Sequence, residues 1–476
     1  MNISVAALDG GKLKVRQTEV EELGTRLRGT ALLGDPGNTD GRGVFNAMYT
    51  AEPSFTVYCA TTSDVVQAVK FARERGLLVA VRGGGHSIAG LSTVDGGMLI
   101  DLSAMSAVVV DPERRLVDAQ GGALWGHVDR ETQLFGLATP GGFVADTGIA
   151  GLTLGGGYGH LRRRYGLSCD NVVEAQVVDA EGNIHRASAE ANPDLYWALR
   201  GGGGNFGLVT SFRYRLHPVG PEVAFAACFH PIENVAELLG SWRSFAASAP
   251  DEVSSVFITV TLPENPHVPQ PVQGRACAVM AGVHAGDVED GMKALQPIRD
   301  IGTPIFDLSQ PMPYTAVQSA FDALYLRGKL RAYWKSQYVD DLSDEVIGVL
   351  TDAALSRPAP LSEVNLAHMG GAIGAVGPED SAFPERSAPF LAAFVGYWDD
   401  AAGDDECIAW ARSAWDNLAR FGTGRSYFNF TGLAGEPPST AVDTVYGPNL
   451  TRLRLVKKAY DPDNFFRRNN NITPAS

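Results

Sequence analysis

Residues 82–87 place three glycines and a histidine directly after an apolar run. The motif is Arg82-Gly-Gly-Gly-His-Ser87, and the apolar run before it is residues 77–81. Glycine accepts positive φ and has no Cβ, so its backbone can approach a ligand closely, and successive amides in such a turn can bind an anion. His86 would then lie against whatever the turn holds. The alternative is a tight turn followed by a surface histidine, and this stretch alone leaves both open.

Two further glycine-rich stretches follow, at 139–159 and 200–207. In the first, the side chains between glycines are mostly small or apolar, which suits backbone wrapped around a large cofactor; a glycine-rich surface loop is the alternative. The second contains G-x-G-x-x-G at Gly202, Gly204 and Gly207. A dinucleotide fingerprint needs a strand before it and a helix after it. The order expected here is the reverse, which argues against a Rossmann site.

Composition bounds the class of protein. The chain has 476 residues, which predicts two domains or three, and its 45% hydrophobic and 20% charged residues are typical of a soluble globular protein. A net charge of −15 argues against a nucleic-acid partner. Five scattered cysteines indicate a reducing compartment, and nine scattered histidines without H-E-x-x-H give no metal site. With neither a signal sequence nor an 18-residue apolar run, we expect a cytoplasmic protein without a membrane partner.

The helices and strands that position these stretches are predicted from the spacing of apolar residues and from residues typical of helix ends. Caps at 61–64 and an apolar face at 65–72 predict a helix that ends at Gly76, between strands at 57–60 and 77–81. Further predicted strands are 98–102, 116–120, 170–179 and 208–216, with helices at 124–135 and 192–199. After a boundary at 218–221, alternation predicts antiparallel strands at 255–262 and 275–283, with helices at 235–247, 288–295, 316–324 and 345–354.

In this order, the motifs resemble those of the FAD-linked oxidases of the vanillyl-alcohol-oxidase (PCMH-type FAD-binding) superfamily, and more narrowly its berberine-bridge-enzyme-like branch. The pieces are Arg-Gly-Gly-Gly-His-Ser at 82–87, Thr-Pro-Gly-Gly at 139–142, the glycine-rich run 147–157, 194–207, Tyr-x-Asn-Phe at 427–430, and Tyr-Asp-Pro-Asp-Asn-Phe at 460–465. They span about residue 55 to the last residue. Together they are highly specific, although no single motif is.

The resemblance implies an α+β fold. A two-lobed PCMH-type FAD-binding domain would occupy residues 1–218, with its core at about 52–218. A substrate-binding domain, an antiparallel sheet covered by helices, would occupy 219–424. Residues 425–476 would return to the FAD-binding domain.

The resemblance also implies that His86 bonds covalently to the flavin 8α-methyl carbon. Many relatives have a second link through a cysteine between residues 140 and 148. Val144 stands there, and Cys169 lies outside the motif, so we expect a single link. The resemblance assigns cofactor binding to Arg82, Gly83, Gly84, Gly85, His86, Ser87, Pro140, Gly141, Gly142, Thr147, Gly148, Gly151, Gly155, Gly156, Tyr158, Gly207, Val209, Asn429 and Asn471.

The family reaction transfers hydride from a substrate carbon to flavin N5 while a base takes a proton from a hydroxyl group. Tyr427 is the first candidate base. A tyrosine needs a nearby cation or donor to ionise, and Arg425 and Lys335 are candidates; an ordinary strand aromatic is the alternative. His368, before Met-Gly-Gly, is the second candidate, with a wall residue and a core histidine as alternatives.

The function implied is an FAD-dependent oxidase that acts on a hydroxyl-bearing small molecule (an alcohol, a phenolic compound, a sugar or a natural-product intermediate). O2 would be the electron acceptor and H2O2 the product, and the protein would be a monomer or a homodimer. The alternatives are a flavin dehydrogenase, an oxidative-cyclisation tailoring enzyme and a non-catalytic flavin- or ligand-binding protein. The sequence does not identify the substrate.

Overall fold

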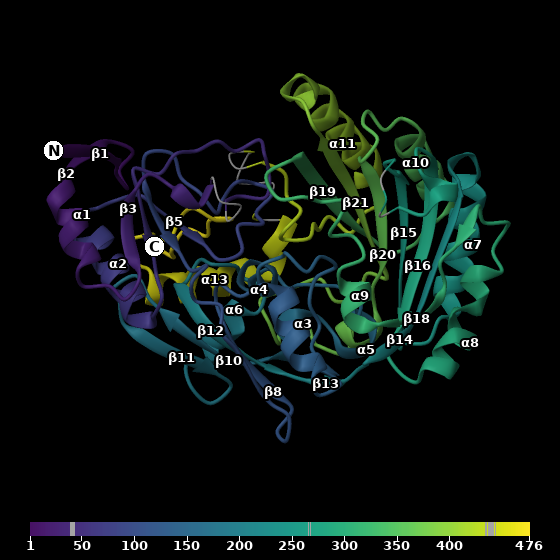
Figure 1. Cartoon of the computed structure of the whole chain (residues 1–476), viewed down its shortest axis with the longest axis horizontal. Helices are drawn as coiled ribbons and strands as arrows, with labels where there is room; N and C mark the ends of the chain where they lie inside the picture. The colour runs from purple at the N-terminus through teal and green to yellow at the C-terminus, as the bar shows by residue number, and fades with distance from the viewer. Residues whose placement is uncertain (39–42, 265, 267, 434–435, 437–441, 443) are drawn as a thin grey trace.

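Three sheets organise the chain (Figure 1). The computed structural model describes residues 1–38, 43–264, 266, 268–433, 436, 442 and 444–476. Two sheets built before residue 216 form one half of the molecule, and an eight-stranded sheet built from residues 222–398 forms the other half. The last segment, yellow in Figure 1, returns to the first half. The α+β class with an antiparallel sheet is therefore confirmed; domain boundaries at 218/219 and 424/425 stay a prediction.

The first sheet carries the turn that precedes His86. Its strand order is β3 (Thr30–Leu33), β4 (Phe55–Tyr58), β6 (Met98–Asp101) and β5 (Val79–Arg82). Helix α2 (Thr62–Glu74) connects β4 to β5, and its N-cap Thr61 accepts a hydrogen bond from the backbone N–H of Asp64 at 3.3 Å. Gly76 follows at φ 63°, as the predicted end of the helix requires. The chain begins with the hairpin β1 (Asn2–Ala6) and β2 (Lys12–Arg16) and helix α1 (Gln17–Gly24).

The second sheet is antiparallel and carries the other two glycine-rich stretches. Its order is β11 (Ile184–Ser188), β10 (Val172–Val178), β12 (Leu208–Arg215), β8 (Leu116–Gln120) and β7 (Val108–Asp111). Around it lie α3 (Trp125–Gln133), β9 (Leu137–Ala138), α4 (Ile149–Leu154), α5 (Arg162–Tyr165), α6 (Pro193–Leu199) and β13 (His217–Pro218). Because α6 precedes the motif at 202–207 and β12 follows it, the order is the reverse of a Rossmann fingerprint, as expected.

The third sheet is also antiparallel, with its strands in the order β17-β14-β16-β15-β20-β21-β19 and β18 paired to β14. The strands are β14 (Glu222–Pro231), β15 (Val253–Thr261), β16 (Ala276–His284), β17 (Phe306–Asp307), β18 (Gln310–Pro313), β19 (Arg331–Val339), β20 (Glu363–His368) and β21 (Phe390–Trp398). Helices α7 (Val235–Ser248), α8 (Val288–Arg299), α10 (Asp344–Leu355) and α11 (Asp404–Ala419) cover one face and share a hydrophobic core with it. The opposite face is turned toward the first half of the molecule.

The helix predicted at 316–324 is shorter than expected. Helix α9 spans Tyr314–Gln318, and Ser319 ends it with its hydroxyl bonded to the carbonyl of Thr315 at 3.0 Å. Phe321 and Tyr325 then line the central cavity. Phe321, which the prediction placed inside the helix, therefore faces that cavity from a turn.

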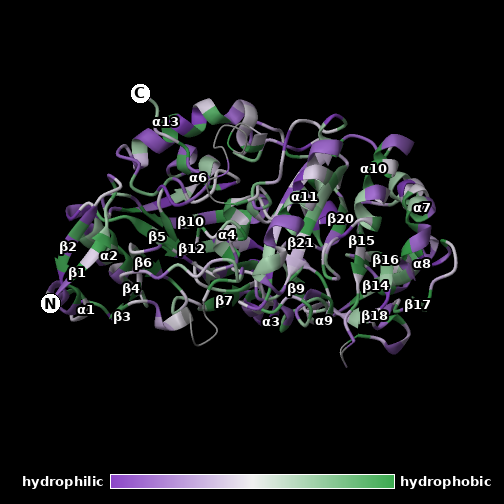
Figure 2. Ribbon diagram, turned by 90° about the horizontal axis from the view of Figure 1, so that it is seen from above, coloured by the Kyte–Doolittle hydropathy of each residue, from purple (hydrophilic) through white to green (hydrophobic). Residues whose placement is uncertain are grey.

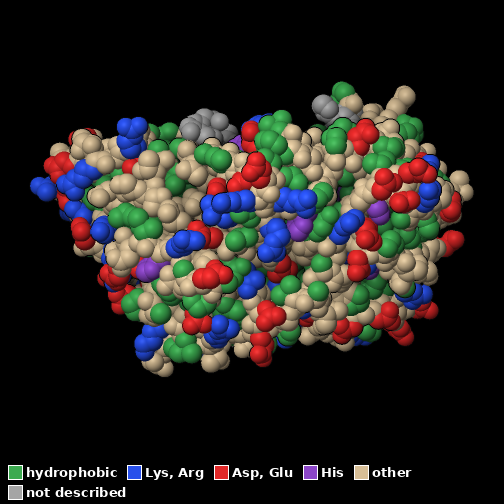
Figure 3. All heavy atoms as spheres, turned by 90° about the horizontal axis from the view of Figure 1, so that it is seen from below, with side chains coloured by type: hydrophobic (Ala, Val, Ile, Leu, Met, Phe, Trp, Pro, Cys, Tyr) green, Lys and Arg blue, Asp and Glu red, His purple; other side chains and the backbone are tan. Residues whose placement is uncertain are grey.

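The surface carries charged side chains of both signs. Figure 2 shows mostly hydrophilic residues on the outer helix α13 (Leu450–Tyr460) and hydrophobic residues around β5. In Figure 3, acidic and basic side chains are interspersed over the face seen from below. Within the described residues, no helix is both long and apolar enough to cross a bilayer.

The C-terminal segment is anchored by a buried ion pair. Lys457, on α13, is fully buried and donates to Asp461 Oδ2 at 2.6 Å and to the carbonyls of Asn205 and Phe466 at 2.7 and 2.9 Å. Asp461 also accepts from the backbone N–H groups of Phe465 and Phe466. The two phenylalanines enter the core of the first lobe. The motif at 460–465 therefore fixes this last segment against the first half of the molecule.

Replacing Lys457 with methionine should destabilise the protein by about 3–5 kcal/mol, because it leaves the Asp461 carboxylate buried without its cation. Denaturant unfolding followed by circular dichroism measures this change. The exposed neighbour Lys458 is the control, and its replacement with methionine should change stability by no more than about 0.5 kcal/mol. Equal effects of the two substitutions would contradict the anchoring role.

Candidate active site

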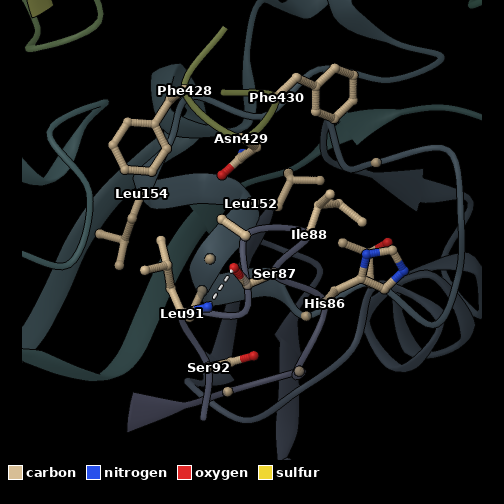
Figure 4. Close-up of a pocket in the computed structure, with 18 of the residues that line it drawn as sticks. His86, Ser87, Ile88, Leu91, Ser92, Leu152, Leu154, Phe428, Asn429 and Phe430 are labelled. Carbon is tan, nitrogen blue, oxygen red and sulfur yellow. Dashed lines mark hydrogen bonds between the residues drawn. The ribbon is translucent and has the colours of Figure 1, made fainter. Parts of the chain in front are cut away.

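A cavity of about 360 Å³ lies between the glycine-rich loops and the free face of the eight-stranded sheet. Loop 83–92, loop 142–148 and helix α4 form one side of it, and the segments 203–209, 427–431 and 466–470 contribute further walls. Figure 4 shows Phe428, Asn429 and Phe430 across the cavity from His86, Ser87 and Leu91. Ser87 Oγ accepts from the backbone N–H of Leu91 at 3.1 Å, which holds the loop after His86 in a compact turn.

Two of the glycine-rich loops touch at Gly84 and Gly148. A Cβ on Gly84 would lie 2.3 Å from Gly148 Cα, and a Cβ on Gly148 would lie 2.5 Å from Gly84 Cα. Both contacts are with backbone, which no rotamer change can relieve. Gly85 follows at φ 68°, in the left-handed region that favours glycine. These positions need glycine to bring two backbones together at the cavity floor.

His86 lies in the cavity wall with an unused polar atom. Its ring stacks on Phe45 with 3.9 Å between centroids, and its Nε2 is buried without a hydrogen-bond partner among the described residues. Burial, together with the charge of Arg327, lowers the pKa of His86 to about 3. The imidazole is therefore neutral at physiological pH and can act as a nucleophile.

Arg82 does not line the cavity, contrary to its predicted role as a cofactor contact. Its Nε donates to Asp101 Oδ2 at 2.5 Å, and its two terminal nitrogens donate to Asp35 at 2.6 and 2.8 Å. The guanidinium is buried and its donors face these two carboxylates. Arg82 thus fixes the start of the glycine turn from behind.

The other predicted cofactor residues divide into two groups. Those that line the cavity are Gly83, Gly84, Gly85, His86, Ser87, Gly142, Thr147, Gly148, Gly151, Tyr158, Gly207, Val209 and Asn429, and Val144 lines it as well. Those that do not are Pro140, Gly141, Gly155, Gly156 and Asn471. A Cβ on Gly141, Gly155 or Gly156 would come within 2.8 Å of Trp125, Phe428 or Phe383, respectively. These three glycines make room for neighbouring rings and do not face the cavity.

Tyr427 lies in the cavity wall as a buried phenol. Its oxygen accepts from the backbone N–H of Gly157 at 3.2 Å and from Asn429 Nδ2 at 3.0 Å. Burial raises the pKa of Tyr427, although both hydrogen bonds oppose the rise. The expected cations are engaged elsewhere, since Arg425 pairs with Glu385 and Lys335 with Glu436, each at 3.5 Å. The phenol is therefore neutral, and its remaining hydrogen-bonding group is an O–H donor.

The second candidate base, His368, is outside the cavity, which corrects that prediction. Residues alternate along β20, so Glu363 and Asn365 face the cavity while His368 faces the helices. Its ring stacks on Phe390, and Arg163 donates to its Nε2 at 2.9 Å. Burial and the charges of Arg163 and Arg162 lower the pKa of His368 to about 3. It is a neutral core histidine.

Sequence reasoning missed the sheet side of the cavity. The residues concerned are Val256, Ile258, Trp334, Glu363, Asn365, Val395 and Tyr397, together with Phe321 and Tyr325 from the segment after α9. The sequence held one signal for a strand with a face toward the cavity. Along 363–367, Glu363, Asn365 and Ala367 alternate with apolar residues. That run is short and matches no motif. Segment 468–470 was missed as well, beside the predicted Asn471.

Comparisons with known proteins agree with this architecture. Residues 53–188 match a family described as "FAD binding domain", and residues 393–473 match one described as "Berberine and berberine like". An FAD-linked oxidoreductase of Dictyostelium discoideum is 32% identical over 427 residues, 89% of each chain. The (R)-6-hydroxynicotine oxidase of Paenarthrobacter nicotinovorans is 29% identical, over 90% of this chain and 93% of the relative.

A solved structure of 6-hydroxy-D-nicotine oxidase from Arthrobacter nicotinovorans superposes with a TM-score of 0.82 at 26% identity, covering 94% of this chain and 98% of the other. Fold, cavity and matches together define a PCMH-type flavoprotein oxidoreductase. Within that class, the chain belongs to the berberine-bridge-enzyme-like FAD-linked oxidoreductases. Its relatives are enzymes, so the non-catalytic alternative is set aside.

Proposed function

We propose that the protein is an FAD-dependent oxidase that removes hydride from a hydroxyl-bearing small molecule, with O2 as the electron acceptor and H2O2 as the product. The observation that carries this proposal is His86, whose neutral imidazole offers an unpartnered Nε2 in a cavity floored by two glycine loops. That arrangement fits covalent attachment of FAD. Bound there, FAD would supply the two-electron acceptor that no amino-acid side chain provides.

The residues around the cavity have distinct tasks in this proposal. The glycine loops let backbone amides approach the cofactor phosphates and ring. Asn429 orients Tyr427 through its 3.0 Å hydrogen bond, and Tyr427 directs its O–H as a donor to a bound oxygen or nitrogen atom. The apolar side chains of the sheet exclude water from the reacting carbon.

A single covalent link is part of the proposal. Val144 lines the cavity and has no sulfur to offer. Cys169 is fully buried, outside the residues that line the cavity, and burial raises the pKa of its thiol. A thiol that stays protonated in a packed core is a poor nucleophile. His86 is therefore the proposed sole attachment point.

Anaerobic and aerobic assays of the purified holoenzyme test the function. A panel of alcohols, phenols and sugars is mixed with the protein without oxygen, and loss of the flavin absorbance identifies substrates. For an oxidase, air should restore the absorbance within the turnover time and yield one H2O2 per substrate oxidised. Slow reoxidation by air, with fast reoxidation by an artificial dye acceptor, would favour the dehydrogenase alternative. A ring-closed product would favour the cyclisation alternative.

A further inference from the structure

Residues 43–48 form an irregular segment between the His86 turn and the half of the molecule that carries the eight-stranded sheet. On one side, the backbone N–H of Phe45 donates to the carbonyl of Gly85 at 2.9 Å. On the other side, the carbonyl of Phe45 accepts from the N–H of Gly328 at 2.8 Å, shortly before β19 begins. The segment therefore joins the turn that carries the histidine directly to the other half of the molecule.

Asn46 is the buried centre of this segment, with none of its surface exposed. Its Nδ2 donates to the carbonyls of Ile88 and Ala332, both at 2.7 Å, and its Oδ1 accepts from the N–H groups of Ala332 and Met48 at 2.9 and 3.0 Å. These four bonds use the full capacity of a side-chain amide. Ile88 lines the cavity two residues after His86 (Figure 4), and Ala332 belongs to β19. One side chain thus connects the histidine loop to the eight-stranded sheet.

The residue before Asn46 sets the plane of the imidazole. Phe45 is fully buried, and its ring stacks on His86 with 3.9 Å between centroids and 22° between the ring planes. Because His86 Nε2 has no partner among the described residues, no hydrogen bond at that nitrogen orients the ring. The stacked ring of Phe45 therefore orients the imidazole, and the bonds of Asn46 hold Phe45 in place.

A second contact comes from the same half of the molecule. Arg327 donates to the carbonyl of Gly43 and to Asp146 Oδ2, each at 2.9 Å. Its Nη1 lies so close to the turn that a Cβ on Gly85 would come within 2.8 Å of it. The turn that carries His86 therefore packs against the other half of the molecule at two places.

We propose that Asn46 is a positioning residue for the covalent attachment of FAD, and that it acts through Phe45 by holding the His86 ring in the orientation from which the imidazole bonds to the cofactor. The inference rests on the proposed function and adds a residue that does not itself line the cavity. Bond formation requires a nucleophile that is close and aligned, and a displacement of about 1 Å can slow a reaction by about 100-fold.

The attachment joins an imidazole nitrogen of His86 to the 8α carbon of the flavin. A C–H bond of the 8α methyl group breaks, its proton leaves, and its electron pair passes into the flavin ring. The imidazole lone pair forms the new C–N bond, and the imidazole N–H proton is released. O2, the acceptor in the proposed function, then takes the two electrons and gives H2O2. Asn46 takes no part in these transfers and fixes only the position of the nucleophile.

The rate of attachment in Asn46→Asp tests the proposal. This variant keeps the shape of the side chain but removes both N–H donors and sets an oxygen against the carbonyls of Ile88 and Ala332. The full chain is produced in a host starved of riboflavin, and FAD is added to the purified protein. Timed samples give total bound flavin by gel filtration and attached flavin by acid precipitation. We expect total binding to equal that of the wild type and attachment to be at least about 10-fold slower.

Asn171→Asp is the matched control for a general loss of stability. Asn171 is 3% exposed, and its Nδ2 donates to the carbonyls of Tyr165 and Leu167 at 2.8 and 2.9 Å, outside the residues that line the cavity. The substitution removes the same two donors. Melting temperatures of the two variants should fall by similar amounts, but Asn171→Asp should attach flavin at the wild-type rate.

Variants of Phe45 keep the test decisive if Asn46→Asp fails to bind FAD. Phe45→Leu removes the stacked ring and should slow attachment by at least about 10-fold. Phe45→Tyr keeps a ring and should restore the wild-type rate. Phe55 is equally buried but lies in the core of the first lobe, so Phe55→Leu should attach flavin as the wild type does.

Equal attachment rates in the wild type and Asn46→Asp would overturn the inference, as would equal slowing by Asn171→Asp. If only Phe45 can be tested, equal rates in Phe45→Leu and Phe55→Leu would overturn it. Failure of the proposed attachment has a different signature, because the wild type itself would then form no acid-stable flavin. Failure of the proposed oxidase reaction appears in the peroxide assay and leaves the attachment rates unchanged.

Discussion

Replacing His86 with alanine should convert a protein that keeps its flavin after acid precipitation into one that releases it. The wild-type pellet should be yellow, because the cofactor is bonded to the chain. The His86→Ala pellet should be colourless, with any flavin in the supernatant. The effect is close to all or none, since the substitution removes the one unpartnered imidazole nitrogen of the cavity wall in the described structure. Visible absorbance of pellet and supernatant measures it.

His160 provides the matched control for this experiment. It is also buried, its Nε2 lacks a partner in the described part of the chain, and burial with the charge of Arg162 lowers its pKa to about 3. It packs edge to face on Phe143, at 4.8 Å between centroids, and does not line the cavity. His160→Ala should keep its flavin in the pellet. A yellow pellet from His86→Ala would contradict covalent attachment at His86.

Replacing Gly84 with alanine should prevent the two cofactor loops from closing against each other. The new Cβ would lie 2.3 Å from Gly148 Cα and 2.5 Å from Gly148 N, so the backbones must separate. Overpacking of this kind typically destabilises by about 1–3 kcal/mol, and here it also displaces His86 from the cavity wall. We expect a lower melting temperature and a flavin-to-protein absorbance ratio well below that of the wild type.

The control is a glycine with open space around it. Its replacement with alanine shows what a Gly→Ala substitution does to stability and flavin content when no clash occurs. Gly348 lies within α10, and a Cβ there would meet no atom within 4 Å. Gly348→Ala should stabilise the helix by up to about 1 kcal/mol and leave flavin content unchanged. If Gly84→Ala retained wild-type stability and flavin content, the close contact between the loops would have no structural importance.

The sequence predicted the half of the site that is built from local signals. The glycine run at 82–87 and the stretch at 139–159 carry their information in residue type, because only glycine permits the contact between Gly84 and Gly148. The caps of α2 and the position of Gly76 are equally local. The motif at 427–430 pointed to Tyr427 through the family resemblance and not through a local signal, and Tyr427 lies in the cavity wall.

The parts that were missed or wrong depend on contacts between residues far apart in sequence. Arg82 was expected to touch the cofactor, but Asp35 and Asp101 bind its guanidinium. The face of the sheet that His368 occupies follows from the register of β20 with β15 and β21, which no local pattern specifies. The same register brings Glu363 into the cavity. Arg425 and Lys335 were expected near Tyr427, yet each pairs with a glutamate.

Peptide mapping of the wild-type protein tests the central claim most directly. Trypsin should release residues 83–114, which contain His86, separately from 131–162, which contains Val144, and 165–186, which contains Cys169. The account predicts that mass spectrometry finds one flavin adduct on peptide 83–114, with fragment ions that place it on His86. The other two peptides should be unmodified. A flavin on either of them, or no flavin on any peptide, would contradict the account.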